Sequence, residues 1–90
     1  MKFWEQIISK NVSYDYALNY IKSYKGTSYI TRPEWDGVHF ISKNNEYCIL
    51  LKTGEVLIDE SEVYDKDKND WLIVTITDKA VKLLEDKDLI

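Results

Sequence analysis

The stretch TRPEWDGVHF, residues 31–40, decides how the chain is interpreted, because it separates two segments that look like β-strands. Pro33 keeps the preceding Arg32 extended, and Asp36-Gly37 is a typical turn pair. The flanking segments TSYITR and VHFISK alternate with the period of two that is typical of strands. The stretch therefore predicts a turn between strands, and its Arg, Trp and His residues raise the question of whether the turn is also a site.

Before this turn the pattern is helical. Ser13 is a natural N-cap for the segment YDYALNYIKSYK, and Gly26 is expected to close that helix. The apolar stripe of the helix consists of Tyr14, Ala17, Leu18, Ile21 and Tyr24. Residues 3–8 also show helical spacing, which predicts a further short helix from Phe3, Trp4, Ile7 and Ile8.

After the turn, strands follow one another closely. VHFISK and EYCILLK are joined at Asn44-Asn45, which suits a tight hairpin, and a turn at Gly54 leads into EVLID. The charged segment ESEVYDKDKND is expected to be a solvated connection. WLIVTIT is the last strand, with Leu72, Val74 and Ile76 suited to the core, and Asp78 is expected to cap a C-terminal helix.

Residues 1–90 are thus predicted to form a single small α+β domain, since 90 residues leave no room for a second core. The expected architecture is a curved antiparallel sheet of about five strands, packed by the helix in the N-terminal half, with a C-terminal helix. Trp71 and Thr75 are then expected on a sheet face that the first helix does not cover. Either the C-terminal helix or another subunit should cover that face.

Composition argues against several classes of function. The net charge is −4 and no Lys/Arg cluster occurs, so we expect no nucleic-acid partner. A single cysteine excludes an intrachain disulfide, and no apolar run approaches the roughly 20 residues of a membrane helix. The opening MKFWEQIISKN is too polar for a signal peptide, so a soluble cytosolic protein without a membrane partner is expected. The 13% aromatic content suggests a self-association surface or a ligand pocket.

Catalytic signals are weak. His39 is the only histidine, and we interpret it as an exposed or hydrogen-bonded strand residue rather than a base. Cys48 is interpreted as a small core residue, although a Cys-His dyad stays open. The segment DKDKND lacks the glycine and terminal glutamate of a calcium loop, and no P-loop occurs. The sequence therefore predicts neither an enzyme, a metal site nor a cofactor.

Binding chemistry is better represented. Arg32 suits phosphate or carboxylate, Trp35 and Trp71 offer flat faces for a purine, and Asp36 and Asn69 suit ribose hydroxyls or base edges. Each residue also has a structural interpretation. Trp35 would be a packed loop anchor, and Arg32 would form a surface ion pair with Glu34 or Asp36. Together the residues favour a nucleotide-like ligand.

Several short motifs occur in an order that points to a family. Ala17-Leu18 and Lys25-Gly26 precede Arg32-x-x-Trp35-Asp36-Gly37, and Asp70-Trp71 opens the last strand, so residues 15–76 are spanned. In this order the chain resembles the second type of Thoeris anti-defence protein, small phage proteins that sequester a bacterial immune signal. The resemblance implies a homotetramer in the cytoplasm of the infected bacterium, which binds glycocyclic ADP-ribose between subunits without cleaving it.

The resemblance also suggests roles for individual residues. Trp71 would stack a base, Trp35 would wall the pocket or the interface, Arg32 would face phosphate, and Thr75 would reach a polar edge. Asp36 departs from the Asn of many members, and a diphosphate would repel its carboxylate, so it would hold the turn unless it binds ribose. The C-terminal helix and the loop 59–70 lie outside the shared pattern. Three alternatives are a sponge for cyclic dinucleotides, a small nucleotide hydrolase using Asp36 or His39, and a protein-binding domain.

Overall fold

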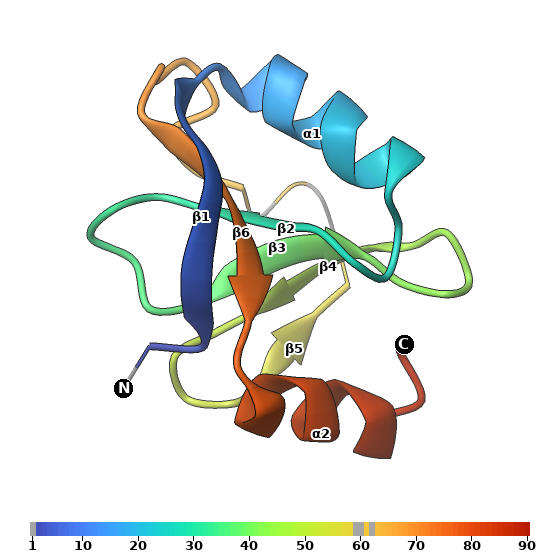
Figure 1. Ribbon diagram of the computed structural model, residues 1–90. Helices are drawn as coiled ribbons and strands as arrows, with labels where there is room; N and C mark the ends of the chain where they lie inside the picture. Colours follow the sequence, from blue (N-terminus) through green and yellow to red (C-terminus); the bar gives the residue numbers. More distant parts are fainter. Residues whose placement is uncertain (1, 59–60, 62) are drawn as a thin grey trace.

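The computed structural model describes residues 2–58, 61 and 63–90, and within these it contains six strands and two helices. In chain order they are β1 (Trp4–Val12), α1 (Tyr14–Ser23), β2 (Tyr29–Thr31), β3 (Val38–Ile41), β4 (Tyr47–Leu50), β5 (Val56–Leu57), β6 (Trp71–Ile76) and α2 (Asp78–Asp86). All pairings are antiparallel, and the strands form one curved, open sheet in the order β1-β6-β2-β3-β4-β5. The predicted α+β class is confirmed, with one more strand than expected (Figure 1).

The sheet is covered on both sides, with α1 and α2 on opposite faces (Figure 1). Alternate residues of each strand point to opposite faces. On the α2 face, Leu72 and Val74 pack with Phe40, Ala80 and Leu84. The other face, here called the α1 face, carries a second cluster that includes Tyr14, Ala17, Ile21, Ile30, Ile49, Trp71 and Ile73.

The expectation that α1 leaves the Trp71 face open is wrong. Trp71 is 1% exposed, and its ring lies 5.1 Å from that of Tyr14 in α1, measured between centroids. The reason lies in the strand order, because β6 is an interior strand between β1 and β2. Both sides of this interior strand are covered, so the odd residues Trp71 and Ile73 are buried along with the even ones, and Thr75 is half-buried.

The predicted helix at residues 3–8 is also wrong, because this segment belongs to the edge strand β1. The pairing of β1 with β6 is irregular, with register shifts between Trp4 and Ile7, between Ile7 and Ser9, and between Ser9 and Val12. Such bulges interrupt the strict period of two. The resulting spacing of apolar residues imitates that of a helix.

The helix ends follow local rules, with small departures from expectation. The Ser13 hydroxyl accepts a hydrogen bond from the Tyr16 amide at 3.1 Å, which confirms the predicted N-cap. α1 ends at Ser23, and Gly26 lies beyond its C-cap with φ of +88°. Consequently Tyr24 is exposed and does not extend the apolar stripe. α2 is capped by Thr77, whose hydroxyl accepts from the Ala80 amide, and Asp78 is instead in the first turn.

The two predicted hairpin turns are present. Asn45 adopts the left-handed conformation with φ of 65° between β3 and β4, and Gly54 has φ of +91° between β4 and β5. The charged connection before β6 is exposed at residues 64–69. Asp59 of the expected strand EVLID, and Glu60 and Glu62 of the charged connection, lie outside the described residues.

Candidate functional site

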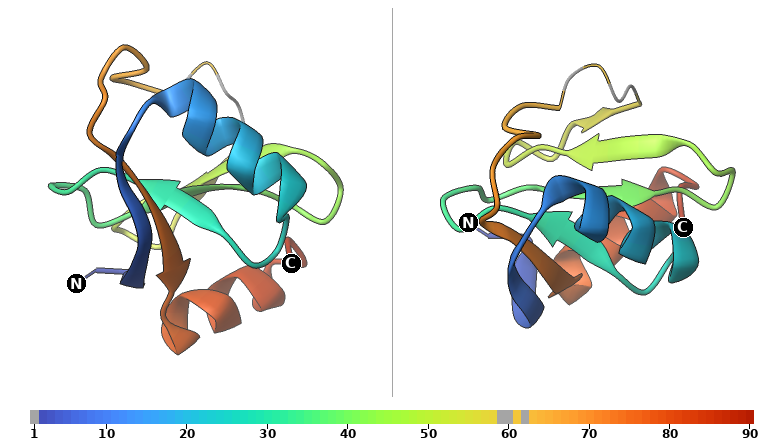
Figure 2. Two further views of the ribbon diagram at one scale, coloured as in Figure 1. Left: turned by 45° about the horizontal axis from the view of Figure 1, so that its top comes forward. Right: turned by 90° about the horizontal axis from the view of Figure 1, so that it is seen from above.

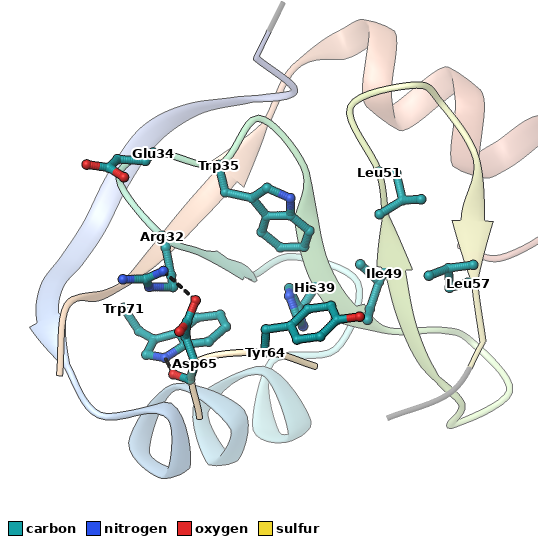
Figure 3. A pocket seen from close by; sticks show the side chains of 10 residues that line it. All are labelled: Arg32, Glu34, Trp35, His39, Ile49, Leu51, Leu57, Tyr64, Asp65 and Trp71. Carbon is teal, nitrogen blue, oxygen red and sulfur yellow. Dashed lines mark hydrogen bonds and ion pairs between the residues drawn. The ribbon is translucent and has the colours of Figure 1, made fainter. Parts of the chain in front are cut away.

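A pocket of about 360 Å³ opens on the α1 face, beside the turn that follows β2 (Figure 3). Its floor is formed by the buried side chains of His39, Ile49 and Trp71, and Trp35 and Tyr64 stand above them as aromatic walls. Leu51 and Leu57 add aliphatic surface at the β4–β5 end, whereas the rim carries Arg32, Glu34 and Asp65. Aromatic walls with a few polar groups are typical of small-molecule sites.

The turn that carries Trp35 is closed by hydrogen bonds, as its Pro33 and Asp36-Gly37 residues predict. The Trp35 amide donates to the Arg32 carbonyl at 3.0 Å, which places Pro33 at the second position of a four-residue turn. The buried Thr31 hydroxyl donates to the Gly37 carbonyl at 2.7 Å. Gly37 is required for steric reasons, because a Cβ atom there would lie 2.1 Å from the Leu50 carbonyl oxygen.

The N-terminal segment fixes the same turn from the other side. The Trp4 indole donates to the Trp35 carbonyl at 3.0 Å, and the Phe3 amide donates to the Asp36 carbonyl at 3.1 Å. The wall residue Trp35 is thus held by contacts from a strand more than 30 positions away in sequence. A pocket wall on such a supported turn is more precisely positioned than one on an unsupported loop.

His39 is the residue whose role the sequence did not indicate. It is 4% exposed, its Nδ1 meets the Tyr47 hydroxyl, and its ring packs edge-on against Trp35 and Trp71 with centroid distances of 4.4 and 5.2 Å. The interpretation of His39 as a hydrogen-bonded strand residue is correct, but the residue is buried rather than exposed. Burial lowers the pKa of His39 to about 3, so its imidazole is neutral near pH 7.

The possible Cys-His dyad is excluded by the register of β3 and β4. His39 faces Ile49 across the strands on the α1 face, whereas Cys48 pairs with Phe40 and belongs to the core of the α2 face. The sheet therefore lies between the two side chains. Burial raises the pKa of the Cys48 thiol, as expected for a core cysteine.

Arg32 is engaged by two carboxylates at the rim. Its Nε and Nη2 donate to the two oxygens of Asp70 at 2.9 and 2.8 Å, and its Nη1 meets Asp65 at 2.7 Å. The hydrogen bonds between them raise the pKa of Arg32 and lower that of Asp70. The sequence suggested Glu34 or Asp36 as ion-pair partners, but the partners come from the segment before β6.

The same segment forms the outer wall of the pocket. The Asp65 carbonyl accepts a hydrogen bond from the Trp71 indole at 3.1 Å, and its carboxylate meets Arg32 (Figure 3). These two contacts hold Asp65 in a left-handed conformation with φ of 62°. Its neighbour Tyr64 is 76% exposed and still lines the pocket. Tyr64 is a second lining residue that the sequence did not indicate.

Three of the six expected site residues meet at the pocket, namely Arg32, Trp35 and Trp71. Asp36, Asn69 and Thr75 are not among the lining residues. Asp36 contributes its carbonyl to the turn, whereas no described residue bonds its carboxylate. The Thr75 hydroxyl accepts from the Gln6 amide of β1 at 3.3 Å, and Asn69 is exposed.

Comparisons with family models, curated proteins and solved structures each gave no match. Among the described residues, no helix is long and apolar enough to cross a membrane. Within that same part of the chain, no three His, Cys, Asp or Glu side chains are grouped so that they could hold a metal ion.

Proposed function

We propose that the protein binds the base of a nucleotide-derived small molecule in the aromatic pocket and sequesters it without cleaving it. The observation that carries the proposal is the gathering of Trp35, His39, Tyr64 and Trp71 around one cavity. Its volume of about 360 Å³ lies at the lower end of the roughly 300–1,000 Å³ of ligand pockets. This supports entry of one ring system and argues against burial of a whole dinucleotide.

Retention rather than turnover is supported by the state of the titratable groups at the pocket. His39, with a pKa of about 3, is a poor general base near neutral pH. Asp65 is engaged by Arg32, and Arg32 in turn is shared with Asp70. Stacking of a base on aromatic side chains is worth about 1–3 kcal/mol and needs no chemical step.

The proposed identity of the signal rests on the sequence resemblance alone. We propose a glycocyclic ADP-ribose type of signal and a role as a phage anti-defence protein in the cytoplasm of the infected bacterium, where capture of the signal would keep the Thoeris effector inactive. A cyclic dinucleotide is the alternative signal. Because Arg32 is neutralised by Asp70 and Asp65, the phosphates of either signal are expected outside the pocket rather than against Arg32.

We also propose that the protein works as a homo-oligomer, a tetramer by the resemblance. The support is the edge strand β1, where Ile7 and Ile8 are 47% and 46% exposed. An edge with exposed apolar residues can pair with another chain. Sedimentation velocity should find an oligomer that dissociates in an Ile7→Lys/Ile8→Lys variant. A wild-type monomer at micromolar concentration would contradict this part of the proposal.

The function is tested by capture and release. The protein is mixed with glycocyclic ADP-ribose, free ligand is removed, and the protein is denatured by heat. Intact signal should be recovered in proportion to protein, whereas a cleaved product at substoichiometric protein would support the hydrolase alternative. If no nucleotide-like ligand raises the melting temperature, the protein-binding alternative gains, since a ligand of the native state must stabilise it.

The pocket itself is tested by a matched pair of tyrosine variants. Tyr64 lines the pocket, whereas Tyr16 is 56% exposed on α1 and does not. Tyr64→Ala should therefore lower capture, and Tyr16→Ala should leave it unchanged. Equal capture by both variants would remove the pocket from the proposed function, even if the protein still sequesters a signal elsewhere.

A further inference from the structure

The floor of the pocket offers one polar atom that the fold leaves available. His39 Nδ1 is occupied by the Tyr47 hydroxyl, and no hydrogen bond from a described residue reaches Nε2. Nε2 also keeps some exposed surface, because it is not among the fully enclosed polar atoms that lack a partner. His39 is 4% exposed as a whole residue, and its ring borders the cavity (Figure 3).

The imidazole is held rigidly in this position. Its ring meets Trp35, Tyr47 and Trp71 in edge-on contacts, with interplanar angles of 65°, 74° and 89°. It projects from β3, which pairs on both sides within the sheet. A hydrogen-bonding group fixed in this way needs little ordering when a ligand arrives, and such preorganisation favours affinity.

The charged rim limits which chemical groups a ligand can bring into the pocket along with its ring. Asp65 and Asp70 bind the guanidinium of Arg32, and the carboxylate of Glu34 also acts on it, so this cation of the rim is already neutralised. A phosphate entering the cavity would find the Arg32 guanidinium already paired and would lose water at an apolar floor. An uncharged ring avoids both costs.

We propose that His39 Nε2 is the specificity-determining contact of this pocket, and that it selects an uncharged nitrogen heterocycle over a hydrocarbon ring of similar shape. The inference rests on the proposed function and narrows its ligand class. When a site is built to hydrogen-bond its ligand, an analogue without the matching group leaves a buried polar atom unpaired. The heterocycle should therefore bind about tenfold or more tightly than the hydrocarbon.

The test compares adenosine, adenosine 5′-monophosphate and 1-naphthalenemethanol by ligand-observed NMR titration. Wild-type protein should prefer adenosine to 1-naphthalenemethanol by about tenfold. His39→Phe keeps an aromatic ring but has no nitrogen, so it should abolish that preference while still binding the hydrocarbon. An unchanged preference in His39→Phe would overturn the proposal. Tighter binding of the monophosphate than of adenosine would overturn the exclusion of phosphate.

A second measurement does not depend on the variant folding. In ¹⁵N-labelled wild-type protein, adenosine should shift the Nε2 resonance of His39, whereas 1-naphthalenemethanol should shift it much less. An Nε2 resonance that adenosine leaves in place would overturn the proposal. Two different results would contradict the proposed function. In the first, neither adenosine nor 1-naphthalenemethanol binds; in the second, Tyr64→Ala binds both compounds as tightly as the wild type does.

Discussion

The two faces of the sheet share the same strands but differ in what covers them. On the α2 face, Phe40, Leu50, Leu72, Val74 and Leu84 form a closed apolar core. On the α1 face, α1 packs against β2, β3 and β6 and lies to one side of β4 and β5 (Figure 2). His39 and Trp71 stand at the limit of that cover, where the pocket begins. The candidate site therefore lies at the edge of the area that α1 covers, between the strands packed against α1 and the strands β4 and β5.

The largest difference between the two faces is expected when a substitution creates a cavity in the apolar core of the α2 face. Leu84 of α2 is fully buried on the face opposite the pocket. Leu84→Ala should cost about 2–5 kcal/mol of unfolding free energy, because both apolar burial and packing are lost. Urea denaturation measures this loss. Ligand affinity per folded molecule should be unchanged, and a large fall in affinity would show that the faces are not independent.

The turn beside the pocket should respond differently, in both stability and binding. Gly37→Ala places a methyl group against the Leu50 carbonyl, which should cost about 1–3 kcal/mol and displace the Trp35 wall. Gly26→Ala is the matched control, since Gly26 has φ of +88° but open space around its Cα. The control should lose about 1 kcal/mol through backbone strain alone and keep full capture. Comparable capture by both variants would contradict the role of the turn.

The buried imidazole gives the α1 face a pH dependence in the acid range, whereas burial raises the pKa of Tyr29 and Cys48 on the α2 face, so these groups respond at alkaline pH. His39 has a pKa of about 3 in the fold against an ordinary value of 6.5, so the unfolded chain binds the extra proton between these values. The stability from the neutral ring is fully present above pH 6.5 and is lost as the pH falls. Between pH 6 and 5 the slope should approach about 1.4 kcal/mol per pH unit.

Urea denaturation of wild type and His39→Phe across this pH range isolates the effect of the imidazole. The variant should show a flatter profile from pH 6.5 to 5, where most carboxylates are still ionised. Parallel profiles for the two proteins would mean that folding does not lower the pKa of His39.

The smallest effect on stability is expected at the outer wall. Tyr64 is largely exposed, so Tyr64→Ala should change the free energy of unfolding by no more than about 0.5 kcal/mol. Its effect on binding should be larger, about 1 kcal/mol, because a stacking surface for the ligand is removed. Thermal melts with and without glycocyclic ADP-ribose measure both quantities. A stability loss above the binding loss would make Tyr64 a structural residue.

Much of the fold could be predicted because its signals are local. The cap at Ser13, the turn at Pro33 and the left-handed Asn45 each depend on residues within a few positions. The helical prediction for residues 3–8 fails because the spacing of β1 reflects bulges in its pairing with the distant strand β6, where Trp4 pairs with Ile76 and Val12 with Trp71. A pattern set by a distant partner cannot be distinguished from a helical one within the segment itself.

The site was predicted less completely for the same physical reason. Arg32, Trp35 and Trp71 were recognised by residue type, and the fold brings them to one pocket. Asp70 and Asp65 as partners of Arg32, and the burial of His39 beneath Trp35, depend on contacts between separate elements. Residue type indicates what a side chain can bind, but not which neighbour has already bound it.

The sequence by itself determined the turn at TRPEWDGVHF, the alternation of the strands on either side of it and the start of α1 at Ser13, because backbone preferences and caps act over one or two turns of chain. Tertiary structure alone decided that α1 covers Trp71, that Asp65 and Asp70 neutralise Arg32, and that His39 becomes a neutral buried group. These properties depend on strand order and on burial, which arise only when distant segments pack together. The turn is a local property of ten residues, whereas the pocket beside it belongs to the whole chain.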